Sequence, residues 1–305
     1  MVIITVLFIQ SCKKEKESLS PSGLTETYSL PQGNNAFDQT IMGYYQSYGT
    51  YLLYKFNDRD VYWSPTAYTK PVLTTAGNWS SGVEVAAADP SYIPAQLDLI
   101  KKKWFNFYSD KFLKKFLPAK IILCSKTDSV GFGYIFTPTL SYTKTIKKVA
   151  AYYNYDNIVV NYGDASVASL TKQDSMGFVA KTNLIFIQSI IARGLSVPTT
   201  EFTNSADYLT AMTTQAQAYG KGIIVSYYSP AVQADWNAYI TAMVSYSEAN
   251  LNKSTVITDT TPVGMLNATK DTNGQVKKRY NIVRNYFINE YQVDLQKIGN
   301  ASKGV

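Results

Sequence analysis

The chain has 305 residues, of which 46% are hydrophobic and 17% charged, and its formal net charge of +7 comes from 29 basic and 22 acidic residues. It contains no histidine, which excludes catalysis or metal binding through imidazole groups. The basic residues are dispersed in short groups and form no continuous basic stripe, so the composition gives no support to nucleic-acid binding. These groups are Lys101–Lys103, Lys114-Lys115, Lys147-Lys148 and Lys277–Arg279.

The first residues have the anatomy of a signal peptide. Val2–Ile9 form an apolar run that only Thr5 interrupts, which is too short for a transmembrane helix of about 20 residues. Ile9-Gln10-Ser11-Cys12 follows and resembles the bacterial lipoprotein cleavage box, in which the cysteine is acylated and becomes the new N-terminus. No Lys or Arg precedes the apolar run, which departs from the usual pattern. We expect a signal peptide over residues 1–11, a lipid on Cys12 and an outer-membrane location, on the cell surface.

A polar segment follows the cysteine. Residues 12–33 are rich in Ser, Pro, Gly and charged side chains and lack apolar periodicity, so we expect a flexible tether with a reach of about 25 Å. If Cys12 carries lipid, Cys124 has no partner for an intramolecular disulfide. Cys124 ends the apolar stretch Ile121–Leu123 and lacks a histidine to activate it, which favours a buried structural cysteine.

The remainder, residues 34–305, is predicted to form one α+β domain. Its longest helix should contain Leu184–Ile187, which is apolar on all sides and therefore belongs in the interior. Asp271-Thr272-Asn273-Gly274 has part of the pattern of a calcium loop but lacks the later ligands, and it is typical of a turn before a helix. Periodicity and breakers predict helices over 37–45, 91–107, 112–116, 172–193, 206–219, 231–247 and 276–291, and strands over 51–56, 120–125, 150–153 and 157–160.

Several segments resemble one known family when they are taken in order. They are Asn35–Asp38, Phe112–Pro118 leading into Lys120–Leu123, Gly222–Ser229 with Asp235-Trp236, and Asn285–Phe287 followed by Val293–Leu295. This order and spacing resemble the zinc-metallohydrolase lipoproteins of Bacteroidota, which are associated with Sus-like outer-membrane importers. The resemblance covers nearly the whole domain. It implies a zincin-like single domain with a buried central helix and a small mixed sheet.

Active members of that family carry His-Glu-x-x-His on the central helix. Positions i and i+4 share a helix face, so both imidazoles bind one zinc, and the glutamate reaches the metal-bound water as general base. The alignment that the resemblance implies places Ile185 and Ser189 at the histidine positions, Phe186 at the glutamate and Ala238 at a third ligand. The resemblance therefore implies a pseudoenzyme without metal or cofactor.

A shift in the alignment does not restore the site, because the chain between Asp174 and Glu201 contains no His, Asp, Glu or Cys. Two interpretations of the vacated positions stay open. They are filled with core, which the all-round apolar helix favours, or they form an uncharged groove that holds a ligand without cutting it.

Other catalytic chemistries have weaker patterns. Ser141–Lys144 and Ser169–Lys172 both match Ser-x-x-Lys, although the supporting motifs of that class are not evident. A carboxylate pair for glycoside hydrolysis could be drawn from several residues whose spacing favours no pair: Asp156, Asp164, Asp174, Asp207 and Asp235. A surface peptidase or glycosidase that uses such non-histidine chemistry is the alternative function.

Tyrosine is abundant, at 25 residues, and suits binding surfaces because it offers a large amphipathic contact at a low entropic cost. We expect Tyr227 and Tyr228 to contribute to a binding surface, because Ser229-Pro230 indicates a loop beside them, and we expect Trp236 on the same surface. The predicted function is that of a non-catalytic accessory lipoprotein of a Sus-like importer, which binds or presents a peptide or an oligosaccharide. The expected partners are a TonB-dependent channel and its lipoprotein lid, with membrane contact through the lipid anchor alone. A scaffold that joins other lipoproteins without a ligand is a third hypothesis.

Overall fold

The computed structural model describes residues 28–305, and the predicted signal peptide, Cys12 and most of the tether lie outside these residues. Pro31–Val305 form one compact unit. Near its beginning, the Gln32 side chain donates to the carbonyl of Lys55 at 2.6 Å and accepts from the backbone N–H of Tyr54 at 2.9 Å. The chain is therefore attached to the compact unit from Gln32 onward.

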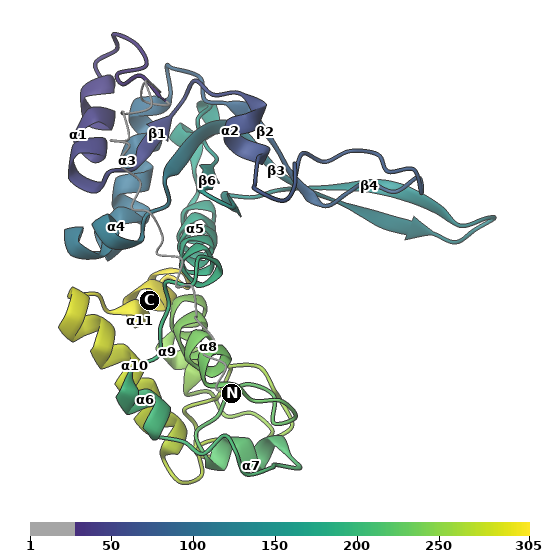
Figure 1. Ribbon diagram of the computed structural model, residues 1–305, viewed down its shortest axis with the longest axis vertical. Coiled ribbons are helices and arrows are strands. Elements are labelled where there is room, and N and C mark those ends of the chain that lie inside the picture. Colours follow the sequence, from purple (N-terminus) through teal and green to yellow (C-terminus); the bar gives the residue numbers. More distant parts are fainter. Residues whose placement is uncertain (1–27) are drawn as a thin grey trace, which may run out of the picture. The chain divides into compact units, whose positions relative to one another are not determined.

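The elements run along the chain from α1 to α11 (Figure 1). The first part contains α1 (Asp38–Tyr48), β1 (Tyr51–Leu53), α2 (Asp58–Tyr62), β2 (Gly82–Ala87), α3 (Ile93–Lys103), η1 (Phe105–Phe107), α4 (Asp110–Phe116), β3 (Lys120–Ile135), β4 (Ser141–Lys148), β5 (Ala151–Asn154), β6 (Asn157–Val160) and η2 (Ala165–Ser169). The second part is helical and contains α5 (Lys172–Ala192), α6 (Thr200–Asn204), α7 (Gln215–Gly220), α8 (Val232–Ser245), α9 (Glu248–Leu251), α10 (Gln275–Tyr291) and α11 (Leu295–Ala301).

The long strand β3 organises the sheet. Its first residues lie between β1 and β6, both parallel to it, and β5 extends this part as an antiparallel neighbour of β6. The middle of β3, Cys124–Val130, pairs antiparallel with β2, and its last part, Asp128–Ile135, pairs antiparallel with β4. Ile121, Ile122 and Leu123 are all fully buried, so this part of the sheet is covered on both faces. The predicted α+β class with a small mixed sheet is confirmed.

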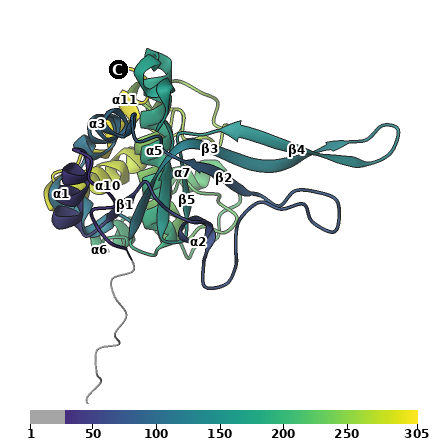
Figure 2. The same ribbon diagram turned by 90° about the horizontal axis from the view of Figure 1, so that it is seen from above.

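The β3–β4 hairpin continues beyond the other strands. Pairing with β2 ends at Val130, whereas pairing with β4 continues to Ile135, which lies opposite Ser141. Two views show this two-stranded arm projecting from the sheet (Figures 1 and 2). The sequence patterns did not predict β2, β4 or the outer half of β3. Gly131 and Gly133 interrupt the apolar residues there, and glycine weakens a strand signal.

The central helix α5 was predicted closely. Thr171 accepts the N–H of Asp174 through its hydroxyl, and the Asp174 carboxylate accepts the Thr171 N–H, which is a capping box. The helix contacts β5, β6, α3, α8 and α11. Its length and composition would suffice for a membrane span, but half of its most apolar window is buried inside the protein. It is the buried core helix that the apolar stretch Leu184–Ile187 predicted.

The predicted helix over residues 206–219 is wrong for most of its length, because only α7 is helical there. The Asp207 carboxylate accepts the backbone N–H groups of Leu209 and Thr210 at 2.9 and 3.2 Å. Such a local bond offers the backbone an alternative to helix formation. The prediction of a turn before a helix at Asp271–Gly274 is confirmed, since Thr272 and Asn273 form a turn that leads into α10. The Asp271 carboxylate caps α10 by accepting the N–H groups of Val276 and Lys277.

Candidate functional site

The positions that the resemblance aligns with zinc ligands lie in the core. Ile185 is 6% exposed, and Phe186 and Ser189 are fully buried. The Phe186 ring makes edge-on contacts with Trp104 at 5.4 Å and Tyr108 at 5.1 Å between ring centroids. Edge-on pairs at these distances add stabilisation beyond the burial of their area. Phe186 therefore belongs to an aromatic core that it forms with Trp104, Tyr108 and Phe112, at the ends of α3 and α4.

Polar groups at the end of α5 are engaged in holding helices together. The Ser189 hydroxyl donates to the carbonyl of Phe186 at 2.7 Å. Arg193 donates to the carbonyl of Ser189 at 3.0 Å and to the carbonyl of Leu117 at 3.1 Å, and it also donates to the carbonyl of Phe116. These bonds satisfy carbonyls at the C-terminal ends of α4 and α5. Burial lowers the pKa of Arg193 below its ordinary value.

The residues at these positions do not fit a zinc ion. Ile185, Phe186 and the half-buried Ala238 offer no ligand atom, and the Ser189 hydroxyl already donates within the helix. Among residues 28–305, no group of three or more His, Cys, Asp or Glu side chains is placed to hold a metal ion. A cavity of about 20 Å³ remains nearby, with room for about one water molecule. It is lined mainly by apolar side chains, among them Ile187, Ile190, Trp236 and Phe287.

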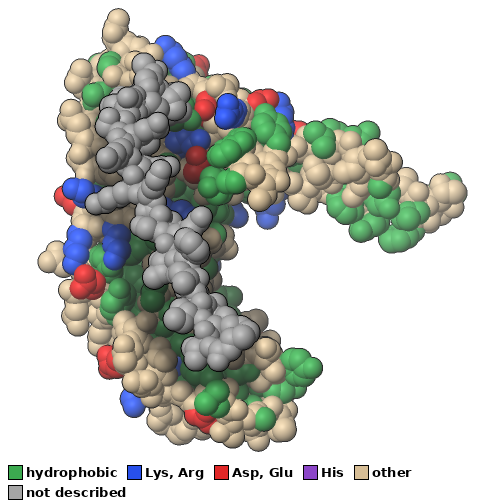
Figure 3. Space-filling view, in the orientation of Figure 1, with side chains coloured by type: hydrophobic (Ala, Val, Ile, Leu, Met, Phe, Trp, Pro, Cys, Tyr) green, Lys and Arg blue, Asp and Glu red, His purple; other side chains and the backbone are tan. Residues whose placement is uncertain are grey.

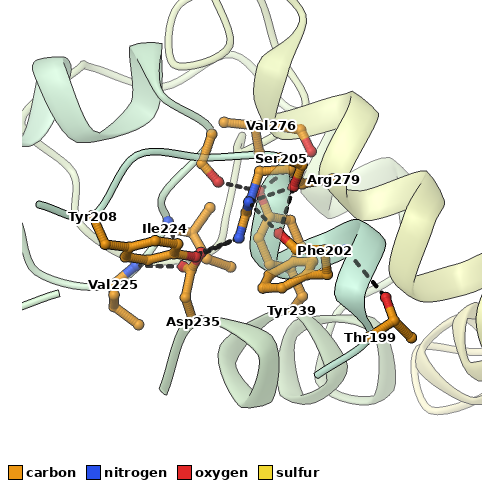
Figure 4. Close-up of polar contacts among 11 residues, drawn as sticks. Thr199, Phe202, Ser205, Tyr208, Ile224, Val225, Asp235, Tyr239, Val276 and Arg279 are labelled. Atoms are coloured by element: carbon orange, nitrogen blue, oxygen red, sulfur yellow. Dashed lines mark hydrogen bonds and ion pairs between the residues drawn. The ribbon is translucent and has the colours of Figure 1, made fainter. Parts of the chain in front are cut away.

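The segment Gly222–Ser229, which the resemblance singled out, is held by Asp235 of α8 (Figure 4). One carboxylate oxygen accepts the backbone N–H groups of Ile224 and Val225 at 2.8 and 3.2 Å. The other accepts the Tyr208 hydroxyl at 2.7 Å. Burial raises the pKa of Asp235, and the hydrogen bond from Tyr208 acts in the opposite direction.

Arg279 of α10 completes this network. Its guanidinium donates to Asp235 at 2.9 Å, and both side chains are fully buried. It also donates to the carbonyl of Phe202 at 3.0 Å and lies 3.7 Å from the centre of the Phe202 ring. Gly222 has a φ of +75°, and a Cβ atom at this position would lie 2.5 Å from the Arg279 side chain. Asp235 and Arg279 therefore connect α6, α8 and α10, and Gly222 allows the chain to pass close to Arg279.

Trp236 was expected on a binding surface, and the structure shows this to be wrong. Its side chain is fully buried, and its indole N–H donates to Ser196 Oγ at 3.1 Å. Its ring packs edge-on against Phe202 and Tyr286 at 5.1 and 5.5 Å. Asp235 and Trp236 both belong to the buried face of α8, which is why Trp236 does not reach the surface.

Tyr228 is placed as a binding residue would be, with 87% of its side chain exposed, whereas Tyr227 is half-buried. The Gln215 side chain holds their loop, because it donates to the carbonyl of Val225 at 3.0 Å and accepts the N–H of Tyr227 at 3.2 Å. A fixed loop presents an exposed aromatic side chain with little entropy left to lose on binding.

An open groove along α10 was missed by the sequence analysis. It encloses about 540 Å³ and is lined by Thr199, Glu201, Lys278, Asn281, Ile282, Asn285, Tyr286, Asn289 and Glu290. Asn281, Asn285 and Asn289 recur every four residues and therefore share one helix face. Each carboxamide offers two donors and one acceptor, which suits the polar groups of peptides and sugars. Burial and contact with Tyr291 raise the pKa of Tyr286 to about 12, so its hydroxyl remains protonated at neutral pH. The signal for this groove was the asparagine period within a correctly predicted helix.

The two Ser-x-x-Lys matches are not arranged as catalytic pairs. Ser141 and Lys144 stand three residues apart on β4, so they point to opposite faces of the strand, and Lys144 bonds Glu84. Ser169 donates to the carbonyl of Ser166 at 3.3 Å.

The candidate carboxylates are likewise engaged, each at a different place in the fold. Asp156 and Asp207 pair with Lys120 and Lys221, at 2.9 and 3.0 Å. Asp164 and Asp174 cap η2 and α5, and Asp235 pairs with Arg279.

The comparisons with known proteins give one match. No family model and no curated protein matches the chain. A crystal structure of a "putative zinc-binding metallo-peptidase" from Bacteroides caccae is 13% identical, covers 88% of this chain and 90% of its own, and has a TM-score of 0.43. Membership of the zinc-metallohydrolase lipoprotein family stays a prediction from the sequence.

Proposed function

We propose that this protein is a non-catalytic, lipid-anchored accessory protein of a Sus-like TonB-dependent importer, and that it holds peptide or glycan substrate near the transport complex. The observation that supports the proposal most is the packing of Ile185, Phe186 and Ser189. In active members of the family that the sequence resembles, these positions carry the zinc ligands and the general base. Here the same positions belong to the core of the protein, with Phe186 packed against Trp104 and Tyr108.

The α10 groove and Tyr228 are the proposed substrate-binding surfaces. Carboxamides along the groove can hydrogen-bond the backbone of a peptide or the hydroxyls of a sugar, and an exposed tyrosine ring can stack on either. A groove of about 540 Å³ has the size of a small-ligand site. Its openness to solvent suits a protein that must release its ligand to a transporter.

The importer is tested by affinity purification of the tagged, lipidated protein from detergent-solubilised outer membranes, followed by mass spectrometry. We expect near-stoichiometric recovery of a TonB-dependent channel and its lipoprotein lid. A Cys12→Ser variant controls for membrane attachment. Recovery of the protein alone would contradict the accessory role.

Substrate binding is tested by calorimetry with panels of oligopeptides and oligosaccharides. Asn285→Ala should weaken binding in the groove about threefold to tenfold, the cost of one hydrogen bond. Tyr228→Ala should weaken binding at the loop. Asn106→Ala is the matched control, because Asn106 is exposed and lies outside the groove. The same panels are assayed for cleavage, and turnover that a single Asp, Glu or Ser substitution abolishes would establish the alternative, a hydrolase.

A further inference from the structure

The β3–β4 hairpin ends in an exposed, uncharged tip. From Ser129 to Thr143 the chain contains no Lys, Arg, Asp or Glu. The large side chains there are open to solvent, with Phe136 exposed by 74%, Leu140 by 55% and Ile135 by 44%. Figure 3 shows hydrophobic side chains gathered along the projecting arm. Apolar side chains clustered on a protruding surface indicate that something other than water covers them.

The chemistry of the side chains changes in order along the hairpin. Ile135, Phe136 and Leu140 lie nearest the turn, and Tyr134 and Tyr142 face each other directly behind them, with ring centroids 5.5 Å apart. Lysines follow on β4, where Lys144, Lys147 and Lys148 lie behind the tyrosine pair, with Phe132 opposite Lys144 and the exposed Ile146 between Lys144 and Lys147. A strand rises about 3.3 Å per residue. Phe136 and Tyr134 are two residues apart, as are Tyr142 and Lys144, so each pair is separated by about 7 Å along the hairpin.

This order is that of a membrane interface. Apolar side chains enter the acyl region, tyrosine rings are enriched at the level of the head groups, and lysines extend their charges toward water. Amphipathic elements that lie in the interface bury their apolar side by about 5–10 Å, which matches the distance from the tyrosine pair to the turn.

The charge balance behind the tip favours anionic lipid. Lys126 and Lys144 both pair with Glu84, and Lys126 lies 3.4 Å from Asp128. Lys147 and Lys148 stand beyond these pairs, and both are exposed. This part of the sheet therefore carries four lysines against two carboxylates. Such an excess near the surface of a bilayer attracts anionic head groups.

We propose that the hairpin tip, Tyr134–Tyr142, inserts into the interfacial layer of a lipid bilayer that carries anionic head groups. It forms a second membrane contact, independent of the lipid on Cys12. This differs from the expectation that the protein touches the membrane through its lipid anchor alone. A folded domain held at two points presents a defined side to its surroundings, whereas a single flexible tether leaves its orientation free.

The first test places a fluorescent reporter in the tip. The full chain carries Cys12→Ser, which removes the lipid attachment site, and Leu7→Asp, which interrupts the apolar run at the N-terminus. Phe136→Trp adds an indole at the tip, and Leu209→Trp adds one at a residue that is 97% exposed and lies outside the hairpin. Vesicles of phosphatidylcholine, alone or mixed with phosphatidylglycerol, should shift the emission of the Phe136→Trp chain to the blue, with the larger effect on the mixed vesicles. Because the chain keeps four native tryptophans, and Trp79 lies against Lys144 of the hairpin, each emission change is measured relative to the parent chain. Brominated lipids should quench the added indole of the Phe136→Trp chain, and the Leu209→Trp chain should show no shift or quenching beyond that of the parent.

The second test removes the apolar side chains. Ile135→Ser, Phe136→Ser and Leu140→Ser are combined in the same background, and the matched control combines Val197→Ser, Leu209→Ser and Val256→Ser, at residues exposed by 64%, 97% and 67%. The tip variant should lose at least about tenfold in vesicle partitioning, because each such side chain is worth about a factor of ten or more when buried. The control should bind as the parent does, and both should keep the parent's unfolding midpoint.

Absence of a blue shift on both kinds of vesicle would overturn the proposal. So would retention of partitioning by the tip variant. If the tip triple instead abolished capture of a protein while vesicle binding was absent, the surface would be a protein interface. Loss of the importer complex in the affinity purification would bear on the proposed function alone, because vesicle binding by the isolated chain does not depend on the importer.

Discussion

Asp235→Ala should destabilise the protein by about 4 kcal/mol, because it leaves the Arg279 charge buried without its partner. Removal of one member of a buried ion pair costs about 3–5 kcal/mol. The Arg279 side chain is fully buried, so water cannot replace the carboxylate. The backbone N–H groups of Ile224 and Val225 would lose their acceptor as well, which places the cost in the upper half of that range.

A double-mutant cycle measures the interaction energy between Asp235 and Arg279 separately from the contacts that each makes with other residues. Arg279→Met alone leaves the Asp235 carboxylate with three donors, from Tyr208, Ile224 and Val225, and should cost about 3 kcal/mol. The double variant contains no buried charge at this place, so its loss should be smaller than the sum of the two single losses by about 2 kcal/mol or more. Asp98→Ala, which breaks an exposed pair with Lys102, is the matched control and should cost about 0–1 kcal/mol.

The assay is urea unfolding at equilibrium, followed by circular dichroism, with free energies from linear extrapolation. If the free energy of unfolding of Asp235→Ala lay within about 1 kcal/mol of the parent's, the argument that this buried ion pair stabilises the fold would be refuted. Additive single losses would refute the claim that the cost comes from an unpaired charge, because packing changes alone would then account for it.

Further predictions concern the backbone, the buried thiol and the response to acid. Gly222→Ala should destabilise the protein by about 3 kcal/mol or more, and Gly274→Ala by only about 1 kcal/mol. Both glycines have a positive φ, but only at Gly222 would the new Cβ have a neighbour within 4 Å. Equal unfolding midpoints for the two variants would contradict this prediction. Burial raises the pKa of the Cys124 thiol to about 12. In a Cys12→Ser chain, this thiol should therefore react with a chromogenic disulfide only after unfolding in urea. Rapid labelling of the native chain would show instead that Cys124 is accessible. The Lys144 ammonium holds the pKa of Glu84 below its ordinary value. The stability from this pair is therefore present above pH of about 4.3 and is lost as the pH falls through the lowered pKa, so Glu84→Gln should flatten the acid side of the stability profile. An unchanged profile would show that the pair does not contribute.

Local signals were sufficient for the core helix. Thr171 and Asp174 form the capping box that begins α5, and Gly194, with a φ of +69°, follows its end. These signals act within a few residues of the chain, which is why the predicted boundaries agree with the structure. The same holds for α10, whose beginning is capped by Asp271.

Elements whose residues are not buried were not predictable in this way. No residue of β4 is buried, and this strand exists through its pairing with the preceding strand β3, so it shows no apolar face from which it could be predicted. The exposure of aromatic residues depends on segments that are distant in the chain. Trp236 and Tyr228 lie near the same loop, yet Trp236 is enclosed by Phe202 and Tyr286, which arrive from α6 and α10.

The sequence by itself determined that no imidazole chemistry is available and that no His, Asp, Glu or Cys lies between Asp174 and Glu201, the stretch that contains most of the central helix. Both follow from residue identity, which does not depend on folding. Only the tertiary structure decided that Phe186 fills the core, that the asparagines of α10 border an open groove and that the tip around Phe136 stands free of the domain. The physical reason is that burial and exposure arise from contacts between segments far apart in the chain, and no local pattern specifies them.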